Sequence, residues 1–404
     1  MKNILLITTI YPLPDKKNYG THVCHYFARE WNKMGYNVKV VHYQAVFPFP
    51  YYWLAKLFRD RIAANTGAVV YTEKDKGGFY QLDGVSILRI PLLKLIPHGN
   101  FVKYAINNSI KRISDWLNYD DFYPDFIIGH FPNPQIEVVS CLKDLWPKSK
   151  TAIVMHLESE NLSIHKLYGQ RFNEMSRHID VWGFRNEYLR QLFKKQVMPL
   201  KNSFICYSGI PSDYIVTNNY HDYRKPLRNF IYVGEMIERK YPIEVLNAIQ
   251  KVYPYKDFTL RYVGQGSLMN IIQRRIEQDN LMNNVQLLGK IPRDKIKEQY
   301  DNADCMVMIS KGEAYGLVYL EAMARGCITI ASRNEGFDGV IINGVNGFLC
   351  EAGNDNELAT IIQSINDLEP EERLRISEKA IATAKRLTDE NAARMYLDDL
   401  NAIQ

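Results

Sequence analysis

Two glutamates stand eight positions apart in the stretch SKGEAYGLVYLEAMARG, residues 310–326. Glu313 precedes Gly316, where the apolar pattern predicts the start of a helix that ends before Gly326. Backbone amides at a helix start can hold phosphate oxygens, whereas a carboxylate beside them suits hydroxyl groups such as those of a sugar. Glu321 lies more than a turn further on, where it could bind a ribose diol. The alternatives are a helix-start acid for Glu313 and a solvated surface residue for Glu321.

Three further loops follow predicted strands and could approach a ligand. Gly20 ends a proline-rich loop before a helix, in place of the GxGxxG fingerprint that a dinucleotide enzyme usually carries. Arg239 and Lys240 follow the strand that ends at Gly234, and two cations there can neutralise a diphosphate. The GxG of residues 264–266 predicts only a tight turn. Each of these features, taken alone, is also typical of an ordinary loop.

Strands alternate with helical patterns in both halves of the 404-residue chain, which favours an α/β fold with one parallel sheet in each half. A chain of this length usually forms two domains, and segment 206–226, rich in Tyr, Asn and Pro, is the expected boundary. Such sheets bind ligands at the carboxyl ends of their strands, so the loops above are the expected site. The expected strands are residues 3–10, 36–43, 124–131, 150–157, 228–235, 258–266, 284–291, 304–310 and 327–332.

The composition, 46% hydrophobic and 24% charged, is that of an ordinary globular protein. No apolar run reaches the ~18–20 residues of a membrane-spanning helix. Residues 1–14 predict a buried strand rather than a signal peptide, because the apolar run is short and no cleavage site follows. The cysteines form no CxxC pair, which favours buried, reduced thiols in a cytoplasmic protein and argues against structural zinc. They are Cys24, Cys141, Cys206, Cys305, Cys327 and Cys350.

Charge is distributed unevenly along the chain. Residues 1–205 hold 27 Lys+Arg against 17 Asp+Glu, and the remainder holds 23 against 28, so the net charge of +5 divides into +10 and −5. A basic half indicates an anionic partner, such as a membrane surface or a phosphate-bearing substrate. Residues 51–62 and 91–117 mix aromatic, aliphatic and basic side chains, as segments that lie on an anionic bilayer do. The alternatives are scattered surface charge and core packing of Trp53, Leu54, Leu57 and Phe58.

Taken together, the motifs resemble retaining glycosyltransferase family 4, which has the GT-B fold: two Rossmann-like α/β domains with parallel sheets that face a central cleft. The specific signature is Glu313, seven residues, and Glu321. Around it YVGEMIERK, LRYVGQGSL, VQLLGKI, YDNADCMVMIS, CITIAS and INGVNGFL stand in the family's order and spacing. The expected domains are an acceptor-binding domain over residues 1–210, completed by a helix at about 388–404, and a donor-binding domain over 211–387.

The resemblance also implies roles for single residues. Glu313 would contact the donor sugar, Lys240 the diphosphate and Glu321 the ribose, while His156 would lie near the donor sugar. His156, Glu313 and Lys240 are the expected catalytic residues, and the nucleotide base would lie by Lys290. The implied donor-binding set is Gly20, Arg239, Lys240, Lys290, Ile291, Glu313, Ala314, Tyr315, Gly316, Leu317, Val318 and Glu321.

The implied activity is retaining transfer of a hexosyl or N-acetylhexosaminyl group from a nucleotide-diphosphate sugar to a glycan or lipid-linked acceptor. The setting would be cell-surface polysaccharide synthesis in the cytoplasm, with the protein peripheral on the inner face of the membrane. We expect no cofactor, no nucleic-acid partner and no essential metal, because no DxD motif occurs where a metal would bind. A donor phosphate oxygen would accept the acceptor's proton. The sequence does not specify the donor base, UDP or GDP, or the acceptor.

One position departs from the family pattern. Glu235 stands directly after the glycine of VGE, where the family often has arginine, and a carboxylate cannot replace a guanidinium against a diphosphate. The alternative function is therefore a catalytically inactive nucleotide-sugar-binding subunit. A glycan phosphorylase would need a pyridoxal-binding lysine and a longer chain, and a sugar-nucleotide epimerase lacks the spaced glutamates.

Overall fold

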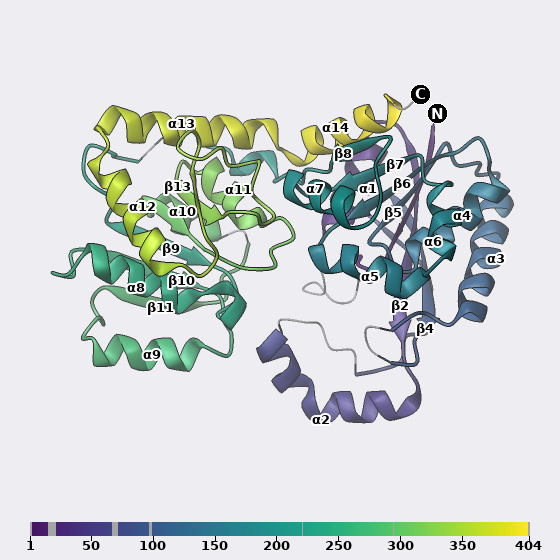
Figure 1. Cartoon of the computed structure of the whole chain (residues 1–404), viewed down its shortest axis with the longest axis horizontal. Coiled ribbons are helices and arrows are strands. Elements are labelled where there is room, and N and C mark those ends of the chain that lie inside the picture. The colour runs from purple at the N-terminus through teal and green to yellow at the C-terminus, as the bar shows by residue number, and fades with distance from the viewer. Residues whose placement is uncertain are drawn as a thin grey trace. The chain divides into compact units, whose positions relative to one another are not determined.

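The computed structural model describes residues 2–14, 22–66, 72–96, 99–219, 221–293 and 295–402, with the side chains of 60–66 left out. The chain divides into two compact units (Figure 1). The N-terminal unit comprises Met1–Arg59, Val69–Ser208 and Asp389–Gln404, and the C-terminal unit comprises Asp60–Ala68 and Gly209–Thr388. The last helix therefore belongs to the N-terminal unit although it ends the chain.

The N-terminal unit is built on an eight-stranded sheet in the order β3-β4-β2-β1-β5-β6-β7-β8. Its neighbouring strands are parallel except for the antiparallel β3–β4 pair. The strands are β1 (Asn3–Thr8), β2 (Asn37–Val46), β3 (Gly78–Leu82), β4 (Val85–Leu93), β5 (Phe126–His130), β6 (Lys150–Met155), β7 (Val181–Phe184) and β8 (Ser203–Ile205). The helices are α1 (Val23–Lys33), α2 (Phe49–Thr66), α3 (Lys103–Tyr119), α4 (Gln135–Leu145), α5 (Glu158–Tyr168), α6 (Arg171–Ser176), α7 (Glu187–Gln196) and α14 (Asp389–Asn401). The N-terminal unit contains α2 only as far as Arg59.

The core of this unit lies on both faces of the sheet. Successive side chains of β1 alternate between two apolar clusters, as the period of a strand requires: Leu5 joins one cluster and Leu6 the other. Helix α14 closes the second cluster with Tyr396, and the indole nitrogen of Trp31 in α1 donates to the carbonyl of Ala393 at 2.9 Å. Burial of β1 confirms the prediction that the apolar N-terminus is a core strand.

The C-terminal unit contains a six-stranded parallel sheet in the order β11-β10-β9-β12-β13-β14. The predicted parallel sheet in each half is therefore confirmed. The strands are β9 (Asn229–Val233), β10 (Thr259–Val263), β11 (Val285–Gly289), β12 (Cys305–Val307), β13 (Ile328–Ser332) and β14 (Phe348–Cys350). The helices are α8 (Pro242–Val252), α9 (Met269–Gln278), α10 (Ile296–Asp301), α11 (Leu317–Ala324), α12 (Asp355–Asp367) and α13 (Pro370–Arg386), with short 3-10 turns η1 (Ser212–Tyr214) and η2 (Glu238–Lys240).

The two segments predicted to lie on a bilayer differ in the structure. Segment 91–117 gives part of its apolar residues to the core: Leu92 of β4 joins one core cluster with Ile106 and Ile113 of α3. Leu95 and Ile96, which follow β4, are each 66% exposed. By contrast, Trp53 and Leu57 of α2 are each 62% exposed, and Leu54 and Phe58 are 47% exposed. Core packing of those four side chains is therefore wrong, and both segments keep exposed apolar side chains.

Two further predictions concern absences. Among the described residues, no helix is long and apolar enough to cross a membrane. The six thiols are unpaired, five of them buried and Cys141 partly buried, which agrees with the predicted buried thiols. Gly20, predicted to approach a ligand, lies outside the described residues.

Candidate functional site

The sheet topology of the C-terminal unit brings two distant loops together. Strands β9 and β12 are hydrogen-bonded neighbours, so the loops that follow them leave the same edge of the sheet side by side. The first loop carries Arg239 and Lys240, and the second carries Glu313. The backbone amide of Lys311 donates to the carbonyl of Arg239 at 2.7 Å and joins the loops directly. Residues about 70 positions apart in sequence therefore share one site.

Lys240 and Glu313 form an ion pair at this edge. Lys240 is only 8% exposed, and its loop is fixed by Tyr232, whose hydroxyl donates to the carbonyl of Glu235 at 2.9 Å. The side chain of Glu313 is 17% exposed, so the pair is neither solvated nor closed off from a ligand. An ammonium and a carboxylate thus stand together where the sequence predicted contacts to diphosphate and sugar hydroxyls.

The Glu313 loop is held by the segment that follows β13. The carboxylate of Glu335 accepts the backbone amide of Glu313 at 2.8 Å, and the amide of Gly336 donates to the carbonyl of Glu313 at 2.9 Å. Helix α11 then begins at Gly316, the N-cap residue, which has φ +85°. A Cβ at Gly316 would collide with the ring of Tyr319, so glycine is needed there for space as well as for conformation.

The start of α11 is confirmed where the sequence predicted it, and so is its end before Gly326. Ala314, Leu317 and Val318 are partly exposed around this start, whereas Tyr315 is buried and packs edge-on against Phe337. The first amides of a helix have no partner within the helix. This turn can therefore present backbone donors to an anion while the Tyr315 ring anchors it to the core.

Glu321 is buried in α11, at 5% exposure. Arg293 donates to one of its carboxylate oxygens from Nε at 3.2 Å and from Nη2 at 3.0 Å, and the Tyr300 hydroxyl lies 3.4 Å from the other oxygen. The alternative of a solvated surface residue is therefore wrong. The carboxylate is held in place by two partners, one of which, Arg293, remains 41% exposed.

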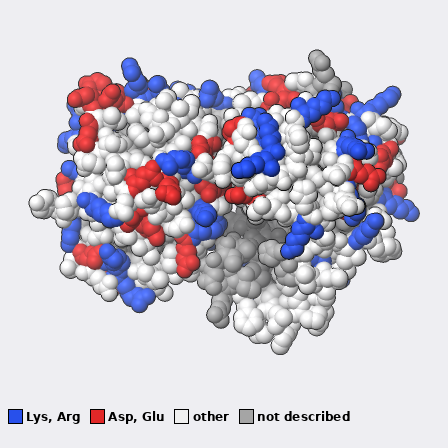
Figure 2. Space-filling model, in the orientation of Figure 1, with Lys and Arg blue, Asp and Glu red and all other residues white. Residues whose placement is uncertain are grey.

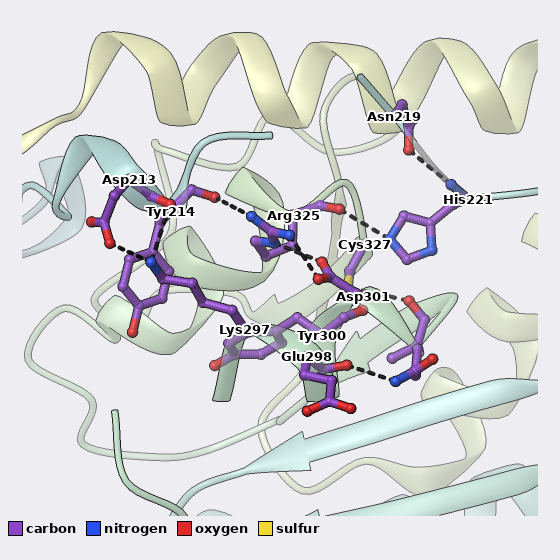
Figure 3. Close-up of polar contacts among 12 residues, drawn as sticks. Asp213, Tyr214, Asn219, His221, Lys297, Glu298, Tyr300, Asp301, Arg325 and Cys327 are labelled. Carbon is purple, nitrogen blue, oxygen red and sulfur yellow. Dashed lines mark hydrogen bonds and ion pairs between the residues drawn. The ribbon is translucent and has the colours of Figure 1, made fainter. Parts of the chain in front are cut away.

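A polar network extends from Glu321 to the segment that follows Gly209. Figure 3 shows Arg325, at the end of α11, between Tyr214 and Asp301. Arg325 pairs with both carboxylate oxygens of Asp301, at 2.6 and 2.7 Å, and donates to the carbonyl of Tyr214 at 3.2 Å. The Tyr214 hydroxyl donates to the carbonyl of Arg293 at 2.8 Å. Residues that hold Glu321 are thereby tied to the η1 segment.

The remaining predicted donor residues lie in the neighbouring loops. Arg239 donates to the carbonyl of Gly312 at 3.4 Å and lies 3.9 Å from the Glu235 carboxylate. Glu235, the residue that differs from the family pattern, therefore faces this arginine. Lys290 and Ile291 follow the edge strand β11, and Lys290 is exposed.

Gly264 joins these neighbouring loops. Its amide donates to the carbonyl of Gly289 at 2.8 Å, which links the loop after β10 to the end of β11, directly before Lys290. A side chain at Gly264 would collide with the carbonyl of Gly234, so the loops after β9 and β10 approach each other closely.

His156 lies in the N-terminal unit, directly after β6 and almost fully buried. Its Nε2 lies 3.1 Å from Nδ1 of His130, whose Nε2 lies 3.2 Å from the Tyr396 hydroxyl of α14. The ring stacks on Phe131 with centroids 3.9 Å apart. Burial, with the neighbouring His130 and Arg185, holds the pKa of His156 well below its usual value, and burial lowers the pKa of His130 to about 3. Both imidazoles are therefore neutral near pH 7.

Glu160 fixes the backbone at His156. Its carboxylate accepts the amides of His156 at 2.6 Å and Leu157 at 3.2 Å, at the start of α5. Burial raises the pKa of Glu160 to about 7, against the two amide hydrogen bonds, which lower it. The sequence does carry a signal for this role, because a glutamate three residues after a helix N-cap typically accepts the backbone amide of that N-cap residue.

Of the predicted residues that the structure describes, Lys240, Arg239, Glu313 and the start of α11 lie at one edge of the C-terminal sheet. His156 follows strand β6 of the N-terminal sheet, and Lys290 and Ile291 follow the edge strand β11. Sequence reasoning missed the residues that hold them in place. The missed residues are His130, Phe131, Glu160, Arg293, Tyr300, Glu335 and Tyr396.

Among the described residues, no group of three His, Cys, Asp or Glu side chains could hold a metal ion.

Comparison with known proteins shows sequence similarity to glycosyltransferases over part of the chain. Residues 221–383 match the family model described as glycosyl transferases group 1. Uncharacterized glycosyltransferase MJ1178 of Methanocaldococcus jannaschii is 30% identical over 173 residues, 42% of this chain and 46% of that protein. N-acetyl-alpha-D-glucosaminyl L-malate synthase of Bacillus anthracis is 33% identical over 142 residues, 35% of this chain and 36% of that protein. These matches span less than half of either relative.

The chain is also similar, over a longer stretch, to UDP-Gal:alpha-D-GlcNAc-diphosphoundecaprenol alpha-1,3-galactosyltransferase of Escherichia coli. The two sequences are 23% identical over 77% of this chain and 68% of that protein. Among solved structures, a glycosyltransferase from Rickettsia africae has a TM-score of 0.68 at 16% identity and covers 100% of this chain and 98% of its own. Anabaena HepE in complex with UDP has a TM-score of 0.66 at 14% identity, with 100% of both chains covered. The chain has the GT-B fold.

Proposed function

We propose that this chain, whose residues 221–383 match the group 1 glycosyl transferase family, transfers a sugar from a nucleotide-diphosphate sugar to a hydroxyl group of an acceptor. The observation that carries the proposal is the Lys240–Glu313 pair beside the glycine-started helix α11. A cation, a carboxylate and free helix-start amides are the groups needed to bind a diphosphate and the hydroxyls of the sugar attached to it. A UDP complex of a solved structure with the same fold supports this kind of donor.

The chemistry follows from where charge develops. As the glycosidic bond breaks, the sugar becomes oxocarbenium-like and the departing diphosphate gains negative charge. Lys240, Arg239 and the amides at the start of α11 would stabilise that charge. Removing one preorganised donor of this kind typically costs ~3–4 kcal/mol of transition-state stabilisation. Glu313 would bind the sugar hydroxyls and Lys240 the diphosphate. Because these two side chains form an ion pair, the sugar and the diphosphate of the donor would be held next to each other.

We infer that transfer retains the configuration of the sugar and needs no metal. The carboxylate of Glu313 is already paired with the ammonium of Lys240. A covalent intermediate between the sugar and Glu313 is therefore not favoured. A donor phosphate oxygen would accept the acceptor's proton on the same face. Proton NMR of the product would show the anomeric configuration, and a chelator in the assay should leave turnover unchanged.

For the acceptor we propose a glycan or lipid-linked molecule used in cell-surface polysaccharide synthesis at the cytoplasmic face of the membrane. One relative acts, by its name, on a diphosphoundecaprenol-linked sugar. The exposed apolar side chains of α2, together with Lys56 and Arg59, supply a surface that suits an anionic bilayer. Figure 2 shows an area without charged side chains at the place that α2 occupies in Figure 1.

A panel of UDP- and GDP-sugars tests the proposal. A bound donor must raise the melting temperature, because a ligand of the folded state stabilises it. An active enzyme also releases some nucleoside diphosphate without acceptor, whereas an inactive nucleotide-sugar-binding subunit raises the melting temperature and releases none. Absence of both effects across the panel would contradict the proposal.

A further inference from the structure

Three buried side chains form a series of hydrogen bonds in the N-terminal unit. The Tyr396 hydroxyl of α14 lies 3.2 Å from Nε2 of His130, and Nδ1 of His130 lies 3.1 Å from Nε2 of His156. The exposed fractions of Tyr396, His130 and His156 are 2%, 0% and 7%. The two histidines stand at the ends of the neighbouring strands β5 and β6, whereas the tyrosine follows His130 by 266 residues. The last helix thereby reaches the predicted catalytic histidine.

The Tyr396 hydroxyl has one hydrogen-bond partner among the described residues, Nε2 of His130. Three aromatic rings pack around the tyrosine, with centroids 5.2, 5.2 and 4.8 Å from its own: those of Phe27, Trp31 and Phe204. Burial raises the pKa of Tyr396 well above its usual value, so the hydroxyl keeps its proton near neutral pH. A buried donor without an acceptor is unfavourable. The hydroxyl of Tyr396 therefore donates to Nε2 of His130.

This hydrogen bond fixes where the protons lie on the two imidazoles. A neutral imidazole has one N–H group and one nitrogen that accepts. Because Nε2 of His130 accepts from Tyr396, the proton of His130 lies on Nδ1, which donates to Nε2 of His156. The proton of His156 then lies on its own Nδ1. In the reverse arrangement His130 would donate to Tyr396, and the buried phenol proton would have no acceptor among the described residues.

Nδ1 of His156 is the open end of the series. No described residue makes a hydrogen bond to this nitrogen, and His156 is the most exposed of the three residues. Its ring is stacked on Phe131 with centroids 3.9 Å apart, and Glu160 accepts its backbone amide at 2.6 Å. The positive charge of Arg185 lowers the pKa of both imidazoles further and so keeps them neutral. The site thus holds a fixed ring with one N–H group available to a ligand.

We propose that Tyr396 is a positioning residue, which acts through His130 to hold His156 with its proton on Nδ1, so that His156 donates a hydrogen bond to an oxygen of the donor sugar. A nitrogen that carries a proton on a neutral ring can donate but cannot accept a proton. His156 is then not the general base of the reaction. The ligand rests on the proposed glycosyl transfer, whereas the position of the proton does not.

Nitrogen-15 NMR of the full chain, labelled at histidine, tests the position of the proton directly. Protonated and unprotonated ring nitrogens differ strongly in chemical shift, and His130→Asn and His156→Asn assign the two sets of signals by their loss. We expect both histidines of the wild type to carry the proton on Nδ1 near neutral pH. Tyr396→Phe keeps the ring but removes the hydroxyl. The form of His156 with its proton on Nε2, which free histidine prefers in water, should then become populated.

Tyr43→Phe is the matched control, since Tyr43 is a buried tyrosine of the same unit whose hydroxyl pairs with Ser109 at 2.8 Å. It should leave both histidines as in the wild type. Wild-type His156 with its proton on Nε2 would overturn the inference, and so would a Tyr396→Phe variant in which both histidines keep their wild-type protons. Melting temperatures show whether each variant folds, and the wild-type spectrum decides the matter if Tyr396→Phe does not.

Release of nucleoside diphosphate from UDP- or GDP-sugars without acceptor gives a second measurement. Asparagine at position 156 offers an amide N–H near the place of Nδ1, and this donor does not depend on Tyr396. We expect Tyr396→Phe to lower kcat about threefold or more in the wild-type background and to have no effect in a His156→Asn background. UDP affinity should not change, because His156 would contact the sugar and not the nucleotide. Equal losses in both backgrounds would show that Tyr396 only supports the fold.

Failure of this inference can be separated from failure of the proposed function. Release of nucleoside diphosphate by a wild type whose His156 carries its proton on Nε2 would overturn only the role of Tyr396. A wild type with the proton on Nδ1 of His156, but without any donor binding or turnover, would support the assigned proton and contradict the transfer reaction.

Discussion

At the scale of single residues, the pair of Glu313 and Lys240 is the centre of the proposed chemistry. Glu313→Gln keeps the size of the side chain and an acceptor for Lys240 but removes the negative charge. We expect kcat to fall about 100-fold, which corresponds to ~3 kcal/mol, with the circular dichroism spectrum unchanged. Glu235→Gln, the same change in the neighbouring loop, should have little effect. A Glu313→Gln variant with more than a tenth of wild-type kcat would contradict the assignment.

Lys240 should act on the diphosphate and not on the nucleoside. Charged hydrogen bonds contribute ~1.5–3 kcal/mol, so Lys240→Ala should weaken UDP or GDP binding about 10- to 100-fold. Binding of uridine or guanosine should be unchanged, because these ligands lack the phosphates. Lys311→Ala, at an exposed lysine of the adjoining loop, is the control. Equal losses for nucleoside and nucleoside diphosphate would show that Lys240 acts on the fold instead. Calorimetry supplies both sets of affinities.

Glu160 should make the stability of the protein depend on pH. Its folded-state pKa is raised from 4.5 to about 7, so between these values the folded state binds more protons than the unfolded state. Stability contributed by this group is therefore full below pH 4.5 and declines as the pH rises towards 7, by roughly 1–3 kcal/mol. His130 and His156, with lowered pKa values, act in the opposite direction.

The comparison with Glu160→Gln isolates the glutamate from the histidines. Glutamine can accept the same amide hydrogen bonds but does not titrate. The difference in unfolding free energy between wild type and variant should therefore shift in favour of the variant from pH 5 to pH 7, as measured by urea denaturation. A difference that stays constant over this range would contradict the raised pKa.

Single residues differ in how far the sequence could predict their positions. Glu313 and Lys240 were predictable as neighbours because each follows a strand end, and parallel strands bring such loops to one edge. The partners that hold the site were not, because they come from segments outside the motifs. Glu335 lies 22 residues from Glu313, and Arg293 lies 28 residues from Glu321. No periodicity in the chain links such positions before the fold brings them together.

At the scale of elements, alternating strands and helices predicted the correct fold class, yet the β3–β4 hairpin was missed. The signal was present: Asp83 and Gly84 both have positive φ between the two strands, and Asp-Gly is a preferred pair for that turn. Segment 91–117, predicted to lie on a bilayer, gives one face of its helix α3 to the core. A helix that packs on a sheet and a helix on a bilayer carry the same amphipathic pattern, so only tertiary contacts separate them.

Near the start of α11, alanine should be tolerated better in place of Gly312 than in place of Gly316. Gly312 and Gly316 both have positive φ, but only a Cβ at Gly316 meets other atoms, those of the Tyr319 ring among them. Gly312→Ala should cost about 1–2 kcal/mol of stability from backbone conformation alone. Gly316→Ala adds a steric clash that displaces the helix start, so it should also weaken UDP binding at least tenfold. Similar nucleotide affinities for the two variants would contradict a role for this helix start in binding.

At the scale of the whole molecule, the charge of +10 on residues 1–205 and the exposed side chains of α2 lie in the same half of the chain. Apolar side chains on an exposed helix cost free energy in water unless something covers them. Basic residues beside them make an anionic bilayer a suitable partner. Helix α3 offers an internal comparison, since it also carries exposed basic residues but gives its apolar face to the core.

Sedimentation with vesicles therefore separates attraction of charge in general from docking of α2. Each basic residue near an anionic surface contributes about 1 kcal/mol, so Lys56→Gln/Arg59→Gln should lower partitioning onto phosphatidylglycerol vesicles about 30-fold. Lys111→Gln/Arg112→Gln removes the same charge from exposed positions of α3 and should have a much smaller effect. Trp53→Ser/Leu57→Ser should weaken the vesicle binding that remains at high salt, because screening removes the electrostatic part of the binding but not the apolar part.

If the α2 and α3 charge variants lose binding equally, the basic half attracts the membrane as a whole and α2 is not the docking element. Equal recovery in the supernatant with neutral and anionic vesicles would show that the protein does not bind the bilayer at all.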